Sequence, residues 1–101
     1  MSKIAFIGPK YLAAPLSAAG IDTFSCDSAQ QGHNIFTTIL GQKEHAIVFI
    51  TERTALELKE NIGEAEKQGI NVVLLPDHRG TTGAAREELQ NLIRRATGAA
   101  S

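Results

Sequence analysis

Apolar residues along this chain fall into two patterns: short continuous runs, and stripes that repeat at three- and four-residue steps. Three mostly apolar runs are bounded by turn-forming residues and are expected to form strands: 3–7, 45–50 and 70–75. Runs of this kind are typical of strands buried on both faces of a parallel sheet. A short segment at 22–26 is expected to form a fourth strand. This segment is the most polar of the four, which predicts an edge strand with Phe24 as its main core residue.

The stripe after the first run predicts a helix whose start is limited by a proline. Apolar residues recur there at helical spacing, and Gly20 supplies a stop. Pro15 lies within the stripe, and proline is tolerated only in the first turn of a helix. We therefore expect this helix to begin near Ala13 or Ala14.

Two further stripes predict the next helices. Ser28 and Gln31 have the spacing of a capping box, so the second helix is expected to begin there and to close at Gly41. Thr51 is expected to be the N-cap of a third helix that ends at Gly69. The apolar residues of this third helix define its buried face: Ala55, Leu58, Ile62 and Ala65.

Strands and helices alternate along the 101 residues, which predicts a single α/β domain. Residues 1–76 would form its core, 77–83 an exposed loop and 84–98 a last amphipathic helix. We expect a four-stranded parallel sheet in the order 2-1-3-4, flanked by helices in a Rossmann-like or flavodoxin-like three-layer sandwich. This order places the two most apolar long strands in the middle.

The composition excludes several classes of function. The formal net charge is -1, whereas nucleic-acid binding through phosphates requires a basic field. The chain has four phenylalanines, one tyrosine and no tryptophan, which is a poor platform for stacking bases. Cys26 is the single cysteine, so no internal disulfide is expected and the cytosol is the expected compartment. No apolar run is long enough to predict direct membrane insertion.

Open parallel sheets bind ligands beyond the carboxyl ends of their strands, here at the switch point between the first and third strands. The first strand is followed there by Gly8 and Pro9, which have neither the repeated glycines of a dinucleotide site nor the acids of a phosphorelay receiver. Lys10, Thr51 and Arg53 could bind an anion at this point, aided by a helix N-terminus. A solvated basic rim with Thr51 as an N-cap explains the same residues, and we prefer that interpretation.

The other residues of chemical interest form no catalytic or metal-binding set. His33, His45 and His78 lie in different predicted elements and fit no short metal motif, so solvated or capping roles are expected. Cys26 is expected to be a small buried hydrophobe rather than a nucleophile. The sequence therefore predicts no catalytic residue, no metal and no cofactor.

Arg94 and Arg95 close the last predicted helix, and two interpretations of them stay open. Cations in the last turn of a helix are stabilised by its dipole. The same pair could instead meet an acidic surface on a partner protein.

Several short motifs follow one another along nearly the whole chain. The first strand and its end read KIAFIG, and an Ala-Gly-Ile segment follows at 19–21. The third strand ends in Ile-Thr-Glu at 50–52, the fourth closes on Pro76, and the segment 86–98 carries a basic pair before a glycine. In this order the motifs resemble the F subunits of archaeal and bacterial V/A-type rotary ATPases. Two prolines depart from the family pattern: Pro9 and Pro15.

The resemblance implies a non-catalytic rotor part of the central stalk. It would bind the D subunit, a long coiled-coil shaft, and contact subunits of the catalytic ring. Its terminal helix would have a role in regulating ATP hydrolysis, within a complex that couples ATP synthesis or hydrolysis to the transport of ions such as protons. The chain would be cytoplasmic and peripheral to the membrane through that complex.

Two surfaces are candidates for the partner interface. The last helix offers one, and the edge strand, whose unpaired backbone is a ready docking line, offers the other. The residues nominated are Arg86, Gln90, Arg94 and Arg95 on the helix, and Asp22 and Phe24 on the strand. Two rival functions stay open: a stand-alone small-molecule or anion-binding module, and a degenerate receiver-like domain that acts by protein contact alone.

Overall fold

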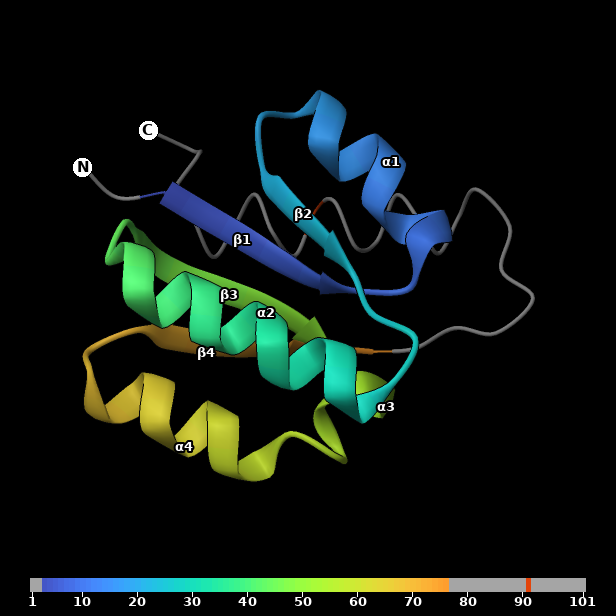
Figure 1. Cartoon of the computed structure of the whole chain (residues 1–101). Helices are drawn as coiled ribbons and strands as arrows, with labels where there is room; N and C mark the ends of the chain where they lie inside the picture. Colours follow the sequence, from blue (N-terminus) through green and yellow to red (C-terminus); the bar gives the residue numbers. More distant parts are fainter. Residues whose placement is uncertain (1–2, 77–90, 92–101) are drawn as a thin grey trace.

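The computed structural model describes residues 3–76 and residue 91 of the chain (Figure 1). Helices and strands alternate through the described part, as the sequence pattern predicts. The elements are β1 (Lys3–Gly8), α1 (Lys10–Ala18), β2 (Asp22–Ser25), α2 (Ala29–Gln42), β3 (His45–Thr51), α3 (Glu52–Ala55), α4 (Lys59–Lys67) and β4 (Asn71–Leu75).

The four strands form one parallel sheet in the order β2-β1-β3-β4. The α/β class, the parallel pairing and the strand order expected from the sequence are therefore confirmed. The two middle strands are the most buried, and their central residues Phe6 and Phe49 are paired in register and fully buried. Burial on both faces explains why these strands read as continuous apolar runs.

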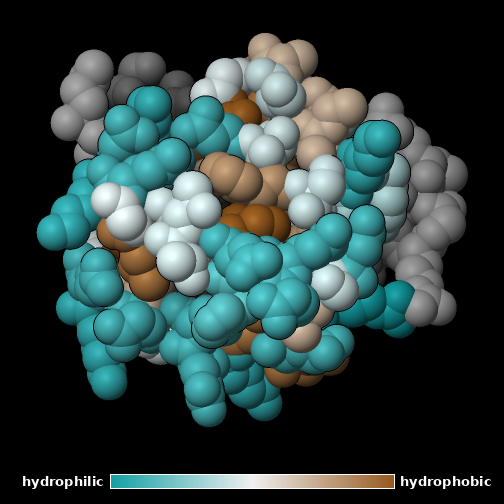
Figure 2. Space-filling model, viewed as in Figure 1, coloured by the Kyte–Doolittle hydropathy of each residue, from teal (hydrophilic) through white to brown (hydrophobic). Residues whose placement is uncertain are grey.

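Side chains alternate between the two faces of the sheet and build two separate cores. Ala5 and Ile7 of β1 point to the face covered by α2, α3 and α4. Phe6 and Phe49 point to the opposite face, where α1 packs through Leu16. Helices therefore flank the sheet on both sides, and Figure 1 shows α2 and α4 running next to each other across the first face. From the same direction, Figure 2 shows a largely hydrophilic outer surface.

The first helix starts earlier than the sequence suggests. α1 begins at Lys10 and keeps Pro15 in its interior. Pro15 lacks the N–H that would bond to the carbonyl of Tyr11, which lies at an exposed position where water can replace the lost donor. The prediction of a start at Ala13 or Ala14 is therefore wrong. The turn before the proline is stabilised because Leu12 and Ala13 are buried against the sheet.

The second helix begins as predicted and ends later. The Ser28 hydroxyl accepts a hydrogen bond of 3.2 Å from the Gln31 N–H, and the Gln31 side-chain carbonyl accepts one of 2.7 Å from the Asp27 N–H. Both bonds satisfy donors at the helix start. α2 continues through Gly41, so the predicted end there is wrong. The chain leaves the helix instead at Lys43, which takes a left-handed conformation with φ 55°.

The predicted third helix is in fact two helices, α3 and α4. Leu56 and Leu58 donate their N–H groups to the carbonyls of Arg53 and Ala55, three residues earlier, at 3.3 and 3.0 Å. Bonds of this spacing tighten the chain into a turn, and Leu58 leaves the helical conformation with φ -125°. The apolar stripe continues across the break at the same spacing, so the sequence pattern could not reveal it.

Candidate functional site

At the switch point, where β1 and β3 end, the backbone of Gly8 is closely packed by neighbouring side chains. Gly8 ends β1, and its carbonyl accepts a hydrogen bond of 2.9 Å from the Cys26 N–H. A Cβ atom on Gly8 would lie 2.7 Å from Cζ of Phe6 and 3.1 Å from Cγ2 of Thr51. Because these side chains already occupy the space beside the glycine, little room is left for a phosphate to approach the backbone.

The three residues nominated for an anion site occupy different environments. Lys10 and Arg53 lie at exposed positions near the starts of α1 and α3, whereas Thr51 is fully buried. The Thr51 hydroxyl donates a 2.7 Å hydrogen bond to the hydroxyl of Thr54. Thr51 is the N-cap residue of α3, as the sequence predicts, but its side chain makes no capping hydrogen bond to a described helix N–H. An anion site formed by these three residues stays a prediction.

Strand β2 lies at one edge of the sheet, as its polar composition predicts. Its two nominated residues both contact a histidine from β3, on the far side of β1. Oδ2 of Asp22 lies 2.9 Å from Nε2 of His45, and the ring of Phe24 meets the same imidazole edge-on at 6.4 Å. Asp22 and Phe24 are therefore already engaged within the domain.

His45 is buried, so the solvated or capping role expected from the sequence is wrong. Its side chain is 0% exposed, and its Nδ1 has no hydrogen-bond partner within the described part of the chain. The pairing of β1 with β3 shifts register between Lys3 and Ile4, which leaves Ala46 as an extra residue. Such a bulge changes the direction in which side chains point, and here it directs His45 toward Phe24.

Cys26 and His33 match their predicted environments. Cys26 is buried, and its thiol donates a 3.3 Å hydrogen bond to the carbonyl of Ser28. Burial raises the pKa of the Cys26 thiol, and the bond to Ser28 offsets only part of this. A raised pKa leaves little thiolate at neutral pH, which does not favour a nucleophile. His33 is exposed, and its Nδ1 accepts a 2.9 Å hydrogen bond from the Asn61 side chain.

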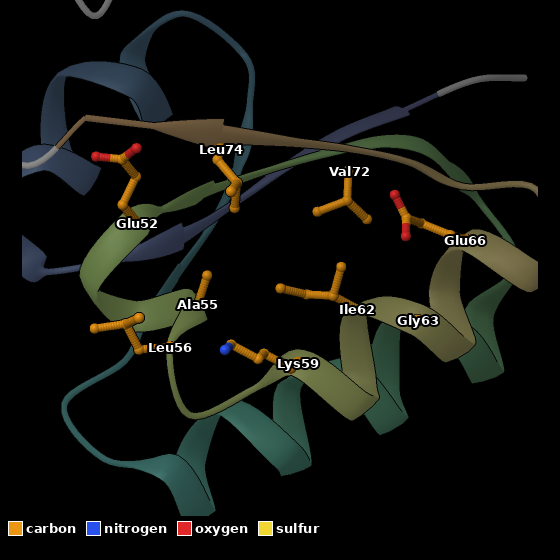
Figure 3. A pocket seen from close by; sticks show the side chains of 9 residues that line it. All are labelled: Glu52, Ala55, Leu56, Lys59, Ile62, Gly63, Glu66, Val72 and Leu74. Atoms are coloured by element: carbon orange, nitrogen blue, oxygen red, sulfur yellow. The ribbon is translucent and has the colours of Figure 1, made fainter.

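An open groove runs between β4, the other edge strand, and the helices α3 and α4. It has a volume of about 530 Å³, and three polar side chains stand around it: Glu52, Lys59 and Glu66. In Figure 3, Glu52 and Glu66 stand at opposite ends of the groove, and Lys59 lies between them on the helix side. The rest of its wall is mainly apolar, contributed by Ala55, Leu56, Ile62, Val72 and Leu74.

Two leucines of this groove are unusually exposed for large apolar side chains. Leu56 is 67% exposed and Leu74 is 53% exposed. Figure 3 shows Val72 and Leu74 pointing from β4 toward the helices, with Ile62 pointing back toward the strand. The sequence pattern did not single out this groove. The sequence gives one sign of it: Leu56 is apolar although it does not belong to the predicted buried face of the helix.

Several predicted residues lie outside the described part of the chain. They are the histidine and four interface residues of the C-terminal segment: His78, Arg86, Gln90, Arg94 and Arg95. The same holds for the predicted loop 77–83 and, residue 91 excepted, for the predicted helix 84–98. Within the described residues, no three His, Cys, Asp or Glu side chains could jointly hold a metal ion. The described helices include none that could cross a membrane.

Comparison with known proteins gives a consistent result. The model of the family described as "ATP synthase (F/14-kDa) subunit" matches residues 4–93 of the chain. The F subunit of the V-type ATP synthase of Clostridium botulinum (strain Eklund 17B / Type B) is 27% identical over 97 residues, which cover 95% of this chain and 93% of the relative.

Two further relatives align over similar lengths. The corresponding V-type F subunit of Clostridium perfringens (strain 13 / Type A) is 26% identical over 97 residues, covering 95% of this chain and 91% of the relative. That of Fusobacterium nucleatum subsp. nucleatum is 27% identical over 99 residues, covering 97% and 93%. The likeness therefore extends from end to end of these proteins and is not confined to one motif.

Proposed function

The chain belongs to the family of the ATP synthase (F/14-kDa) subunit, and we propose that it is a non-catalytic rotor component in the central stalk of a V-type ATP synthase. The observation that carries this proposal is the family match over residues 4–93, which spans all four strands of the sheet. The V-type resemblance noted in the sequence agrees with it, since the relatives are V-type subunits that align over nearly their whole length.

The proposal includes named partners. The chain binds the D-subunit shaft and turns with it inside the catalytic ring, whose subunits it also contacts. Its C-terminal segment, residues 84–98, takes part in regulating ATP hydrolysis, and Arg86, Gln90, Arg94 and Arg95 belong to that contact surface. Through these partners the chain sits at the periphery of a membrane, on the cytoplasmic side, and contributes to ATP synthesis or hydrolysis coupled to ion transport.

The chemistry of the described residues supports a role in binding rather than in catalysis. At the end of β1, beside the point where such sheets commonly hold ligands, Gly8 is closely packed by Phe6 and Thr51. The single thiol has a raised pKa because it is buried, and the buried imidazole of His45 already interacts with Asp22. A rotor component needs a well-packed body and contact surfaces, and the two buried cores of this domain are in keeping with that.

Reconstitution tests the non-catalytic role. The catalytic ring and shaft would be assembled with and without this chain, and ATP hydrolysis measured in each preparation. We expect the isolated chain to hydrolyse no ATP, and the ring and shaft without it to keep hydrolysis while its rate or its regulation changes. ATP hydrolysis by the purified chain alone would contradict the proposal.

An anion-binding module using Lys10, Thr51 and Arg53 is the alternative, and thermal stability distinguishes it. A ligand at one hundred times its dissociation constant stabilises a folded protein by about 2.7 kcal/mol. We expect phosphate, phosphate esters and nucleotides to leave the melting temperature unchanged. A clear rise with one of them, lost in Arg53→Gln, would favour the alternative.

A further inference from the structure

The groove between β4 and the helices is an apolar surface that no described element covers. β4 pairs only with β3 within the described sheet, so its other side has no neighbouring strand there. Leu74 on the strand and Leu56 after α3 stand more than half exposed on the two sides of the groove. Single exposed leucines are ordinary, but two that line the same mainly apolar groove indicate a contact surface.

The shape of the groove favours a helix over an added strand as its occupant. A strand paired to the outer edge of β4 would bond to its backbone but would leave the helix side of the groove, Ala55 and Ile62, uncovered. A helix laid beside α4 can insert apolar side chains at three- and four-residue steps between the strand and the helices. Only the helix covers Leu56 and Leu74 together.

The charged residues around the groove indicate which side chains a partner helix needs. Glu52 and Glu66 stand at its two ends, with a single lysine between them on one wall (Figure 3). Two glutamates against one lysine among the residues that line the groove give it a net negative charge. A partner helix that complements it has an apolar stripe flanked by basic residues that reach the two glutamates.

We propose that this groove docks an amphipathic helix of the shaft subunit, with apolar side chains between Leu56 and Leu74 and basic side chains on Glu52 and Glu66. The inference rests on the proposed rotor function, for which it names the contact surface. It differs from the two surfaces that the sequence suggested, the β2 edge and the C-terminal helix. Because the charged contacts lie at the ends of the groove, binding weakens as salt is added.

Binding measurements with the co-expressed D subunit test the groove. The double variant Leu56→Gln with Leu74→Thr removes the apolar contacts at exposed positions, and Tyr11→Gln is the matched control, an exposed apolar residue of α1 on the opposite face. We expect the dissociation constant to rise at least about tenfold in the double variant and to stay within about twofold of the wild type in the control. Glu52→Gln with Glu66→Gln is expected to raise it less and to reduce its dependence on salt.

The possible outcomes test the groove proposal separately from the proposed rotor function. Wild-type affinity in a folded double variant overturns the groove while leaving the rotor function standing, and failure of the wild type to bind the shaft overturns both. An equal loss in Tyr11→Gln also overturns the groove, because it shows that the effect is not local. Circular dichroism and melting temperature establish that each variant is folded.

A photoreactive phenylalanine analogue at position 74 identifies the occupant. An adduct with the D subunit that maps to a helix with a basic, apolar face supports the proposal. A crosslinked dimer of this chain, or an internal crosslink to residues 77–101, overturns it by showing that a second copy or the chain's own C-terminal segment fills the groove.

Discussion

Two contact regions on the same face of the sheet, which we call seams, differ in how tightly they are packed. Leu58, between α3 and α4, is 2% exposed and packs against Gly32 of α2, where a Cβ would lie 2.9 Å from its Cδ2 and 3.2 Å from Sγ of Cys26. Leu56, two residues earlier, is 67% exposed on the groove beside β4. The first seam is tightly packed because Gly32 has no side chain to keep Leu58 away, and the second is an open groove. The comparison separates residues that hold the domain together from residues available to a partner.

Truncation of Leu58 and of Leu56 is expected to give the largest difference in stability between the two seams. Leu58→Ala would remove a fully buried side chain and leave a cavity, so we expect the free energy of unfolding to fall by about 2–5 kcal/mol. Leu56→Ala is expected to change it by no more than about 0.5 kcal/mol. Urea unfolding monitored by circular dichroism measures both. Similar losses in the two variants would show that the exposed leucine is structural after all.

Adding a methyl group at Gly32 tests how tightly the seam with Leu58 is packed. Gly32→Ala forces its new Cβ against Leu58, and we expect a loss of about 1–3 kcal/mol in stability. Gly41→Ala is the matched control in the same helix, since a Cβ there meets no described atom within 4 Å. The control is expected to stabilise by up to about 1 kcal/mol through helix propensity. If Gly32→Ala were as stable as the control, the seam would not be tightly packed.

A smaller effect is expected at the β2 edge, where the exposed Asp22 contacts the buried His45. Asp22→Asn keeps the size of the side chain but weakens its contact with the buried His45, whose Nδ1 has no hydrogen-bond partner in the described structure. We expect the free energy of unfolding to fall by about 1 kcal/mol and binding to the shaft to be unchanged. Reduced binding with unchanged stability would instead support the β2 edge as an interface.

The smallest effect expected is the pH dependence contributed by Cys26. Its pKa is raised in the folded state because the thiol is buried, so the unfolded chain loses this proton at lower pH than the folded chain. The corresponding stability is present below about pH 8.5 and is lost as the pH rises toward the folded pKa. Comparing the melting temperature of the wild type with that of Cys26→Ala between pH 7 and 10 measures it. A wild type that gained stability relative to the variant at high pH would contradict the assignment.

The parallel sheet and its strand order were predictable because they depend on patterns repeated along the chain. Four strand-like segments separated by helical stripes leave few alternatives, and the order follows from placing the most apolar long strands centrally. The cap at Ser28 was visible for a similar reason, since its hydrogen bonds join near neighbours in sequence.

The features that the sequence did not reveal depend on contacts between distant elements. The bulge at Ala46 changes the direction of His45 without changing the apolar pattern. Leu58, at the break between α3 and α4, packs against Gly32 of the distant helix α2. The groove was missed because Leu74 looks like any other residue of a buried strand. Its exposure results from the place of β4 at the edge of the sheet.

Co-expression of this chain with the D subunit of the same source organism, followed by size-exclusion chromatography, tests whether the chain is a component of the rotor. We predict that the two chains elute together as a one-to-one complex and that Tyr11→Gln behaves in the same way. Separate elution of a folded chain and a folded D subunit would contradict the rotor-stalk assignment.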